Sequence, residues 1–74
     1  MRLAEVRRSR LLSLRELSAK AGLNIMTVNN IERGRTTPSL STIRKLCEVL
    51  DVEPMEVDEF RDAIRGKELA PASS

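Results

Sequence analysis

The side chains best suited to specific hydrogen bonding are concentrated in one short stretch, residues 24–33 (NIMTVNNIER). Asn29 and Asn30 each carry an amide that donates and accepts at once, which matches the edge of an adenine in the major groove of DNA. Ile25 and Met26 are apolar and could contact the methyl group of a thymine. The stretch therefore supplies five candidates for reading bases, namely Ile25, Met26, Thr27, Asn29 and Asn30. Because no arginine lies on the face expected to read bases, we expect an A·T-rich site and no readout of guanine by arginine.

Catalytic chemistry has little support in the sequence. The chain has no histidine, so it lacks the commonest general base, and its one cysteine cannot form a disulfide within the chain or a usual zinc-finger site. Ser18 has no obvious base to activate it, and we interpret it as a small residue where two helices approach closely. We therefore expect no catalytic residue, no metal site and no cofactor, and we do not expect an enzyme.

A first short helix is predicted to precede the base-reading candidates. Ser13 and Glu16 have the spacing of a capping box, which can start a helix over about residues 14–21. Gly22 can end that helix in the left-handed conformation without a side-chain penalty. Leu23 follows and is expected beneath the turn.

A second short helix is predicted to carry the base-reading candidates. Asn24 has the right side chain to cap it, Val28 and Ile31 form its apolar face, and Gly34 can end it. A helix, a tight turn and a second helix form the arrangement that presents side chains to a groove of DNA.

The ordered series of residues through this region resembles the phage-repressor-like (Cro/XRE-type) helix-turn-helix family. No single pair is specific, but the series at these spacings is. The matching residues, within about residues 3–57, are Leu17-Ser18, Ala21-Gly22-Leu23, Thr27-Val28, Ile31-Glu32-Arg33-Gly34, Pro38-Ser39-Leu40 and Leu50-Asp51-Val52. The resemblance implies an all-α fold, a compact five-helix lambda-repressor-like domain that binds double-stranded DNA.

The resemblance also implies roles for individual residues. Arg7 and Glu32 match a pair that links the first helix to the end of the recognition helix, so a partly buried ion pair is expected. Leu14 stands where the family commonly has a glutamine that bonds a DNA phosphate, so only its backbone N–H can serve. Leu11 stands where the family often has a glycine, so the first helix is expected to run on or to close differently, with Leu12 in the core.

The loop after the second helix is expected to lie along the DNA backbone. Arg35 brings charge, and Thr36 and Thr37 bring donors. Pro38 prevents a helix before it, and Ser39 can cap the next one, where N–H groups could also bind a phosphate. Residues at the start of the helix over residues 14–21 are predicted to contact phosphates as well. The full set of predicted phosphate contacts is Ser13, Leu14, Arg35, Thr36, Thr37 and Ser39.

Three further helices are predicted. Leu3 and Val6, surrounded by arginines, indicate one over residues 2–10, and a fifth helix is expected from Pro54 to about residue 65, ended by Gly66. The buried face of a helix over residues 40–50 is marked by Leu40, Ile43, Leu46, Cys47 and Leu50. The domain is thus expected to cover residues 1–66, with a disordered tail over residues 67–74 (KELAPASS).

A homodimer is predicted, because one helix-turn-helix reads too few base pairs to select a site and dimers read two half-sites. Val57 is expected to complete the core. The predicted dimer interface on the fifth helix consists of Met55, Phe60 and Ile64. The alternative is that Phe60, the chain's only aromatic residue, folds back on Leu3 and Val6 and closes the monomer's own core. The acidic residues expected on the outer side of this helix are Glu56, Asp58, Glu59 and Asp62.

The charge distribution favours a polyanionic partner for the first part of the chain. Residues 1–50 carry ten Lys/Arg and four Glu, a net +6, whereas residues 51–74 carry three Lys/Arg and seven Asp/Glu, a net −4. We therefore expect a small transcriptional regulator, most simply a repressor, that binds a palindromic A·T-rich operator.

The alternative is a protein-binding module, such as an antitoxin that also represses its own operon, with Ile25 and Met26 contacting the partner. The sequence shows no signal peptide and no apolar run of membrane-spanning length, so we expect a cytoplasmic protein without a membrane partner.

Overall fold

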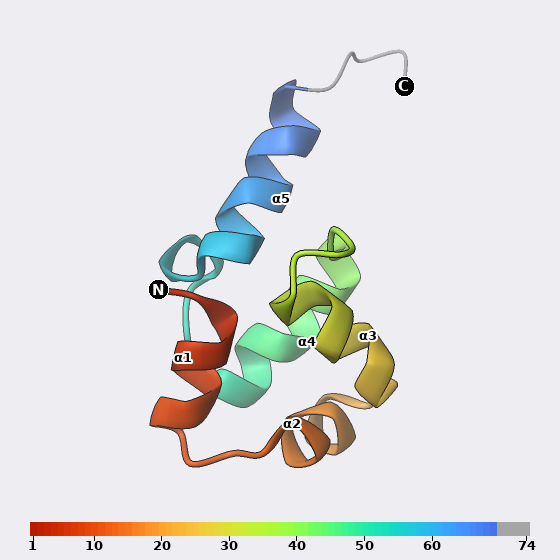
Figure 1. Ribbon diagram of the computed structural model, residues 1–74. Coiled ribbons are helices and arrows are strands. Elements are labelled where there is room, and N and C mark those ends of the chain that lie inside the picture. Colours follow the sequence, from red (N-terminus) through yellow and green to blue (C-terminus); the bar gives the residue numbers. More distant parts are fainter. Residues whose placement is uncertain (70–74) are drawn as a thin grey trace.

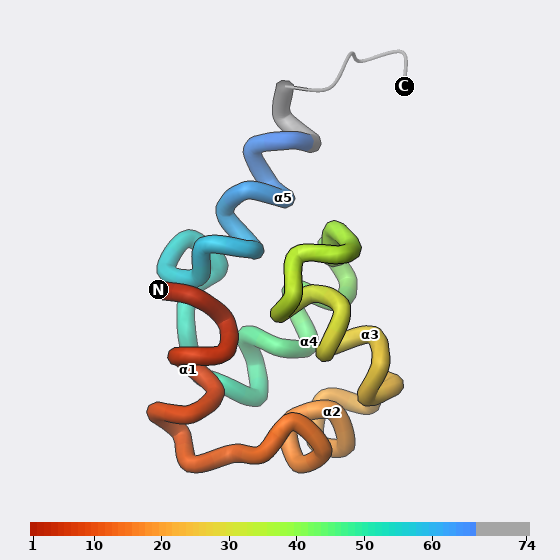
Figure 2. The backbone as a smooth tube through the Cα atoms, in the orientation of Figure 1, coloured from red at the N-terminus to blue at the C-terminus, as the bar shows by residue number. Residues whose placement is uncertain are grey.

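The computed structural model describes residues 1–69, which form five α-helices and a short 3-10 turn and, over this range, contain no β-strand (Figure 1). The elements are α1 (Leu3–Ser9), α2 (Leu14–Ala21), α3 (Ile25–Glu32), α4 (Leu40–Leu50), the 3-10 turn η1 (Pro54–Glu56) and α5 (Asp58–Leu69). The all-α class expected from the sequence is confirmed. Helices α1 to α4 lie together, and α5 starts near the N-terminal end of α1 and projects away from the others (Figure 2).

The ends of α2, α3 and α4 follow the capping chemistry expected from the sequence. The Ser13 hydroxyl accepts from the Glu16 N–H at 3.0 Å, and the Glu16 carboxylate accepts from the Ser13 N–H at 2.9 Å. Gly22 ends α2 at a φ of 68°. The Asn24 side chain caps α3 by accepting from the Met26 N–H at 2.8 Å. These caps fix where α3 begins and therefore which of its side chains face outward.

Of the two alternatives for the end of α1, the structure shows that the helix does not run on but closes before Leu11. The helix stops at Ser9, and Leu11 then adopts a left-handed φ of 59° with its side chain 90% exposed. This conformation is costly for a residue that has a Cβ atom, and glycine would adopt it without that cost. Leu12 follows and packs, half-buried, against the core as expected.

The core draws on all five helices. Its buried apolar residues are Leu3, Val6, Leu17, Ala21, Val28, Ile31, Ile43, Leu46, Leu50, Val57, Phe60 and Ala63. Leu40 was expected on the buried face of α4, but this is wrong, since its side chain is 53% exposed. It lies in the first turn of α4, where it lines an open hollow together with Ile64 of α5. Cys47 is half-buried, and burial, together with Glu53 and Glu56, raises the pKa of its thiol to about 11.

The predicted fifth helix is divided into two elements. Pro54 starts η1 and not α5, and Val57, extended at a φ of −109°, turns the chain before α5 begins at Asp58. Gly66 does not end α5, which continues to Leu69. A glycine inside a helix costs only about 1 kcal/mol relative to alanine, so the helix can continue through it. The tail predicted over residues 67–74 is therefore helical as far as Leu69, and its remainder lies outside the described residues.

Phe60 belongs to the core of the monomer, so its assignment to a dimer interface is wrong. Its side chain is fully buried, in the same cluster as Leu3 and Val6, as the alternative interpretation proposed. Of the other two residues of that predicted interface, Met55 is 49% exposed and Ile64 is half-buried against the core. An apolar period of 3–4 residues identified the face of α5 correctly, but not the surface that covers it.

Polar contacts between the first residues and the start of α5 hold Phe60 in place. The Met1 amine donates to the Asp58 carboxylate at 3.2 Å, and the Asp58 N–H donates to the Met1 carbonyl at 2.7 Å. Glu59 was expected on the outer side of the helix, which is wrong. Its side chain is only 10% exposed, and it accepts from the Leu3 N–H at 2.8 Å with Arg2 Nε 3.5 Å from its other oxygen. The carboxylate of Glu59 thus lies at the N-terminus of α1, where helix geometry favours negative charge.

Candidate nucleic-acid interface

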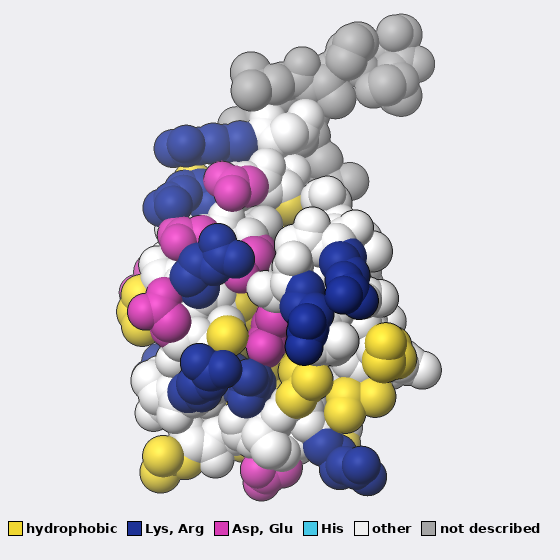
Figure 3. All heavy atoms as spheres, viewed as in Figure 1, with side chains coloured by type: hydrophobic (Ala, Val, Ile, Leu, Met, Phe, Trp, Pro, Cys, Tyr) yellow, Lys and Arg dark blue, Asp and Glu magenta, His cyan; other side chains and the backbone are white. Residues whose placement is uncertain are grey.

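The exposed side of α3 carries the base-reading candidates. Val28 and Ile31 are buried, while Met26 is 54% and Ile25 is 37% exposed on the same helix. Thr27 is exposed, and Asn29 and Asn30 are half-buried. The five candidates therefore lie on or beside the surface of one helix. In the view of Figure 3, the side of the molecule over α3 and the loop after it shows basic and apolar side chains, whereas acidic ones gather toward α5.

The structure contains the ion pair that the resemblance implied between α1 and the last residue of α3. Arg7 Nε donates to Glu32 Oε2 at 2.7 Å, and Arg7 Nη2 donates to Glu32 Oε1 at 3.1 Å. Both side chains are about nine-tenths buried, at 11% and 9% exposed. Arg7 Nη1 also donates to the Leu12 carbonyl at 3.0 Å, so one guanidinium joins α1, α3 and the loop before α2. Such a fork-to-fork pair fixes the orientation of α3 against the body.

The phosphate-contact candidates lie in two groups at the ends of helices. Arg35, Thr36 and Thr37 are exposed on the loop between α3 and α4, and the Arg35 N–H donates to the Asn30 carbonyl at 2.9 Å. Ser39 caps α4 by accepting from the Thr42 N–H at 3.2 Å. Ser13 and Leu14 start α2. As caps, both serine hydroxyls accept a hydrogen bond, which leaves the Ser13 O–H able to donate to a phosphate, whereas the Ser39 O–H donates to Thr42 Oγ1 at 3.0 Å. The backbone N–H groups at the starts of α2 and α4 are further phosphate donors.

Arg33 occupies a place that was not anticipated. Its Nε donates to Asn29 Oδ1 at 3.3 Å, one helical turn back along α3. An arginine therefore lies beside the face that carries the base-reading candidates. The sequence could have predicted this contact, because Asn29 and Arg33 are four residues apart and such residues are neighbours on a helix.

A hollow with three arginines in its lining, the basic hollow, lies between α1, α2 and α3. It measures about 310 Å³ and is lined by Ala4, Arg7, Arg8, Leu14, Asn29, Glu32 and Arg33. It joins the start of α2 to Asn29 and Arg33 of α3. Arg8 was not among the predicted site residues, and no spacing in the sequence placed it beside Leu14.

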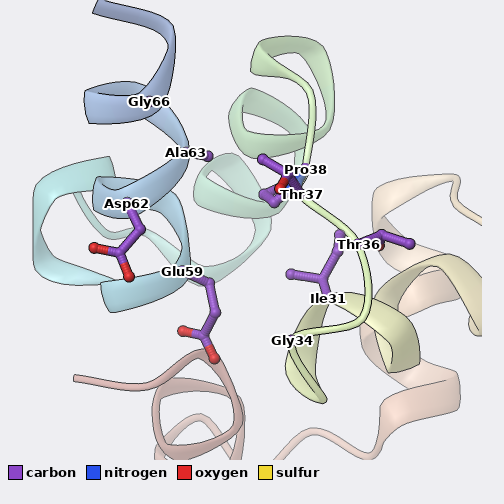
Figure 4. Close-up of a pocket in the computed structure, with 9 residues that line it drawn as sticks. All are labelled: Ile31, Gly34, Thr36, Thr37, Pro38, Glu59, Asp62, Ala63 and Gly66. Carbon is purple, nitrogen blue, oxygen red and sulfur yellow. The ribbon is translucent and has the colours of Figure 1, made fainter. Parts of the chain in front are cut away.

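An acidic hollow lies on the other side of the loop that follows α3. It measures about 370 Å³, and Figure 4 shows Glu59 and Asp62 of α5 on one side and Thr36, Thr37 and Pro38 of the loop on the other. Carboxylates repel a phosphate backbone, so this hollow marks where the basic face ends.

Two further properties concern residues 1–69 only. None of the helices in this part is both long and apolar enough to cross a membrane. No group of three or more His, Cys, Asp or Glu side chains there is placed to hold a metal ion.

Comparison with known proteins decides the family. A helix-turn-helix family model matches residues 3–57, which contain α1 to α4 and η1. The chain belongs to the Cro/XRE-like helix-turn-helix family. The resemblance seen in the sequence is therefore confirmed, and the lambda-repressor-like fold agrees with it. Members of this family bind DNA and regulate transcription.

Two curated relatives are similar to this member of the helix-turn-helix family. The HTH-type transcriptional regulator DdrOP3 of Deinococcus deserti is 40% identical over 45 residues, which cover 61% of this chain and 35% of the relative. An uncharacterized HTH-type transcriptional regulator of Bacillus subtilis, RghRB, is 43% identical over 51 residues, which cover 68% of this chain and 37% of the relative. The chain thus matches little more than a third of the length of either relative. No solved structure matches it significantly.

Proposed function

We propose that this helix-turn-helix chain binds double-stranded DNA sequence-specifically, with α3 in the major groove, and represses transcription from the site it occupies. The observation that carries the proposal is the way α3 is held. The buried Arg7–Glu32 pair fixes its last residue, and the Asn24 cap fixes its first turn. The outward side chains of α3 are thereby preorganised on a rigid element beside the exposed Arg35 loop.

The proposed site is A·T-rich. The first turn of α3 presents Ile25 and Met26, which suit thymine methyl groups, and its second turn presents Asn30, which suits adenine. The proposed phosphate contacts are the loop residues Arg35, Thr36 and Thr37, with N–H groups at the starts of α2 and α4.

We further propose that two copies bind a palindromic operator. With Phe60 assigned to the core, the apolar surface near α5 includes the exposed Met55 and an open hollow lined in part by Leu40 and Ile64. A two-fold dimer would place two α3 helices about one turn of DNA apart. Sedimentation equilibrium with and without operator DNA tests this part of the proposal.

Selection from random duplex DNA, followed by fluorescence anisotropy on the enriched sequence, tests the function as a whole. We expect an inverted repeat with A·T-rich half-sites. Met26→Ala and Met55→Ala form a matched pair, because both side chains are about half exposed, at 54% and 49%. Met26→Ala should change base preference, whereas Met55→Ala, on the proposed dimer surface, should weaken dimer formation and leave the base preference within each half-site unchanged. A chain that enriches no sequence contradicts the proposal.

The second candidate function is a protein-binding module, which the exposed apolar pair Ile25 and Met26 favours. Such a module, like an antitoxin, would use the same surface for its partner. In that case Met26→Ala would abolish partner binding while leaving DNA preference unchanged.

A further inference from the structure

The charge of the basic hollow is not balanced by its own residues. Arg7 and Glu32 neutralise each other through their two short contacts. Arg8 and Arg33 remain as positive charges at the rim, both exposed to solvent. A hollow with this surplus attracts an anion of the size of a phosphate group.

In the hydrogen bond between Arg33 and Asn29, only Arg33 can be the donor. A guanidinium carries donors and no acceptor, so the Asn29 atom that faces Arg33 Nε at 3.3 Å is the oxygen. Asn29 therefore orients Arg33, and Arg33 keeps its four remaining N–H donors for another acceptor. In turn, the Asn29 oxygen is already engaged, so the amide is no longer well placed for bidentate pairing with adenine.

The start of α2 supplies the other half of the hollow. The first N–H groups of an α-helix, here those of Leu14 and Arg15, have no partner within the helix and carry partial positive charge. Leu14 lines the hollow but its side chain cannot donate a hydrogen bond. The Leu14 side chain therefore gives no hydrogen bond to a phosphate bound there.

We propose that Arg33, oriented by Asn29, supplies the side-chain donor that Leu14 lacks, so that the basic hollow binds one backbone phosphate of the DNA. The Leu14 N–H, Arg33 and Arg8 then hold this phosphate between α2 and α3. Asn29 acts as a positioning residue for Arg33 and not as a reader of bases. The inference rests on the proposed function, and it changes the assignment of one of the five base-reading candidates.

The phosphate is located with duplexes that carry a single neutral methylphosphonate at each backbone position in turn. One position in each half-site should weaken binding of the unaltered chain by about tenfold, as expected for the loss of a charged hydrogen-bonding partner. Arg33→Ala should bind more weakly to all sequences alike, lower the salt slope by about 1, and become insensitive to that same methylphosphonate. Arg44→Ala, which removes an exposed arginine of α4 outside the hollow, should remain sensitive to it.

Asn29 and Leu14 provide the decisive variants. Asn29→Ala should reduce affinity without changing the preference at any base position, whereas Asn30→Ala should change one. Leu14→Gln adds a donor to the hollow from the other helix, so it should restore affinity to Arg33→Ala. Circular dichroism of each variant confirms that the helices are retained.

Three outcomes overturn the inference. If the unaltered chain selects no DNA sequence, the proposed function fails and the inference fails with it. If it selects a sequence but Asn29→Ala relaxes one base position, Asn29 reads a base and only the inference fails. If Arg33→Ala keeps both its salt slope and its methylphosphonate sensitivity, Arg33 does not contact the phosphate, and again only the inference fails.

Discussion

Leu11 provides a direct test of how backbone conformation limits the stability of this fold. Its φ of 59° lies in the left-handed region, and its side chain is 90% exposed. Replacing it with glycine removes a conformational cost of about 1–2 kcal/mol that a Cβ atom imposes there. Against this, glycine gives the unfolded chain more freedom, which costs about 0.4–1 kcal/mol. Almost no buried area is lost, so Leu11→Gly should raise the free energy of unfolding by about 0.5–1 kcal/mol.

Thermal unfolding followed by circular dichroism measures this effect. For a domain of this size, the expected gain corresponds to a rise in Tm of about 2–6 °C. Leu11→Ala is the matched control, because it removes the same exposed side chain but keeps the Cβ atom and hence the strain. Its Tm should stay near that of the unaltered chain. If Leu11→Gly is no more stable than Leu11→Ala, the argument from left-handed strain is refuted.

Four further predictions concern the core, the interface and pH. Phe60→Ala should destabilise the monomer by about 3–5 kcal/mol, measured by urea unfolding, because it empties a fully buried site. An unchanged urea midpoint would contradict the burial of Phe60. Asn30→Ala should relax specificity at one base position by about 1–3 kcal/mol in a panel of single-base variants. Arg35→Ala should weaken binding to all sequences and lower the salt slope by about 1, and an unchanged slope would mean that Arg35 points to solvent. The hydrogen bond from the Met1 amine, with help from Arg61 and Arg2, lowers the pKa of Asp58 below its usual value. The pKa of Asp58 is thus lower in the folded chain than in the unfolded chain. The ionised Asp58 carboxylate therefore stabilises the fold at pH values above the unfolded pKa, and this stabilisation is lost as the pH falls through the folded pKa. Asp58→Asn should therefore reduce stability at neutral pH and flatten the acid part of a pH–stability curve.

Much of the fold could be predicted because its local signals agree with one another. Ser13 with Glu16, Gly22 and Asn24 are residues whose side chain or backbone chemistry specifies a helix end, and the structure uses each of them in that way. These signals are local, so a single sequence contains them in full.

The errors share a different physical origin. Phe60 and Leu40 were both assigned from apolar periodicity, which identifies the face of a helix but not the neighbour that covers it. Phe60 is buried in one cluster with residues of α1, more than 50 positions away, whereas Leu40 stays 53% exposed beside an open hollow. Gly66 was taken as a helix end, but the cost of one glycine is small enough for a helix to continue through it.

The candidate site was predicted unevenly for the same reason. The Arg7–Glu32 pair could be expected only through the family resemblance, since the two residues lie far apart in sequence. The contact between Arg33 and Asn29 follows from helix geometry and could have been found without any relative. The basic hollow depends on how α1 packs beside α2 and α3, and a linear sequence does not contain that information.

The contacts between Met1 and Asp58 and between Leu3 and Glu59 have a consequence for the order in which the chain folds. Each joins residues more than 50 positions apart, so forming them requires a long loop to close, with a corresponding loss of chain entropy. The contacts of α2 with α3 and α4 join segments much closer in sequence. Local structure of this kind forms early, and distant pairings follow. Helices α2, α3 and α4 can therefore assemble before α5 docks, and opening of the α1–α5 junction would let amide hydrogens exchange there while those of α3 stay protected.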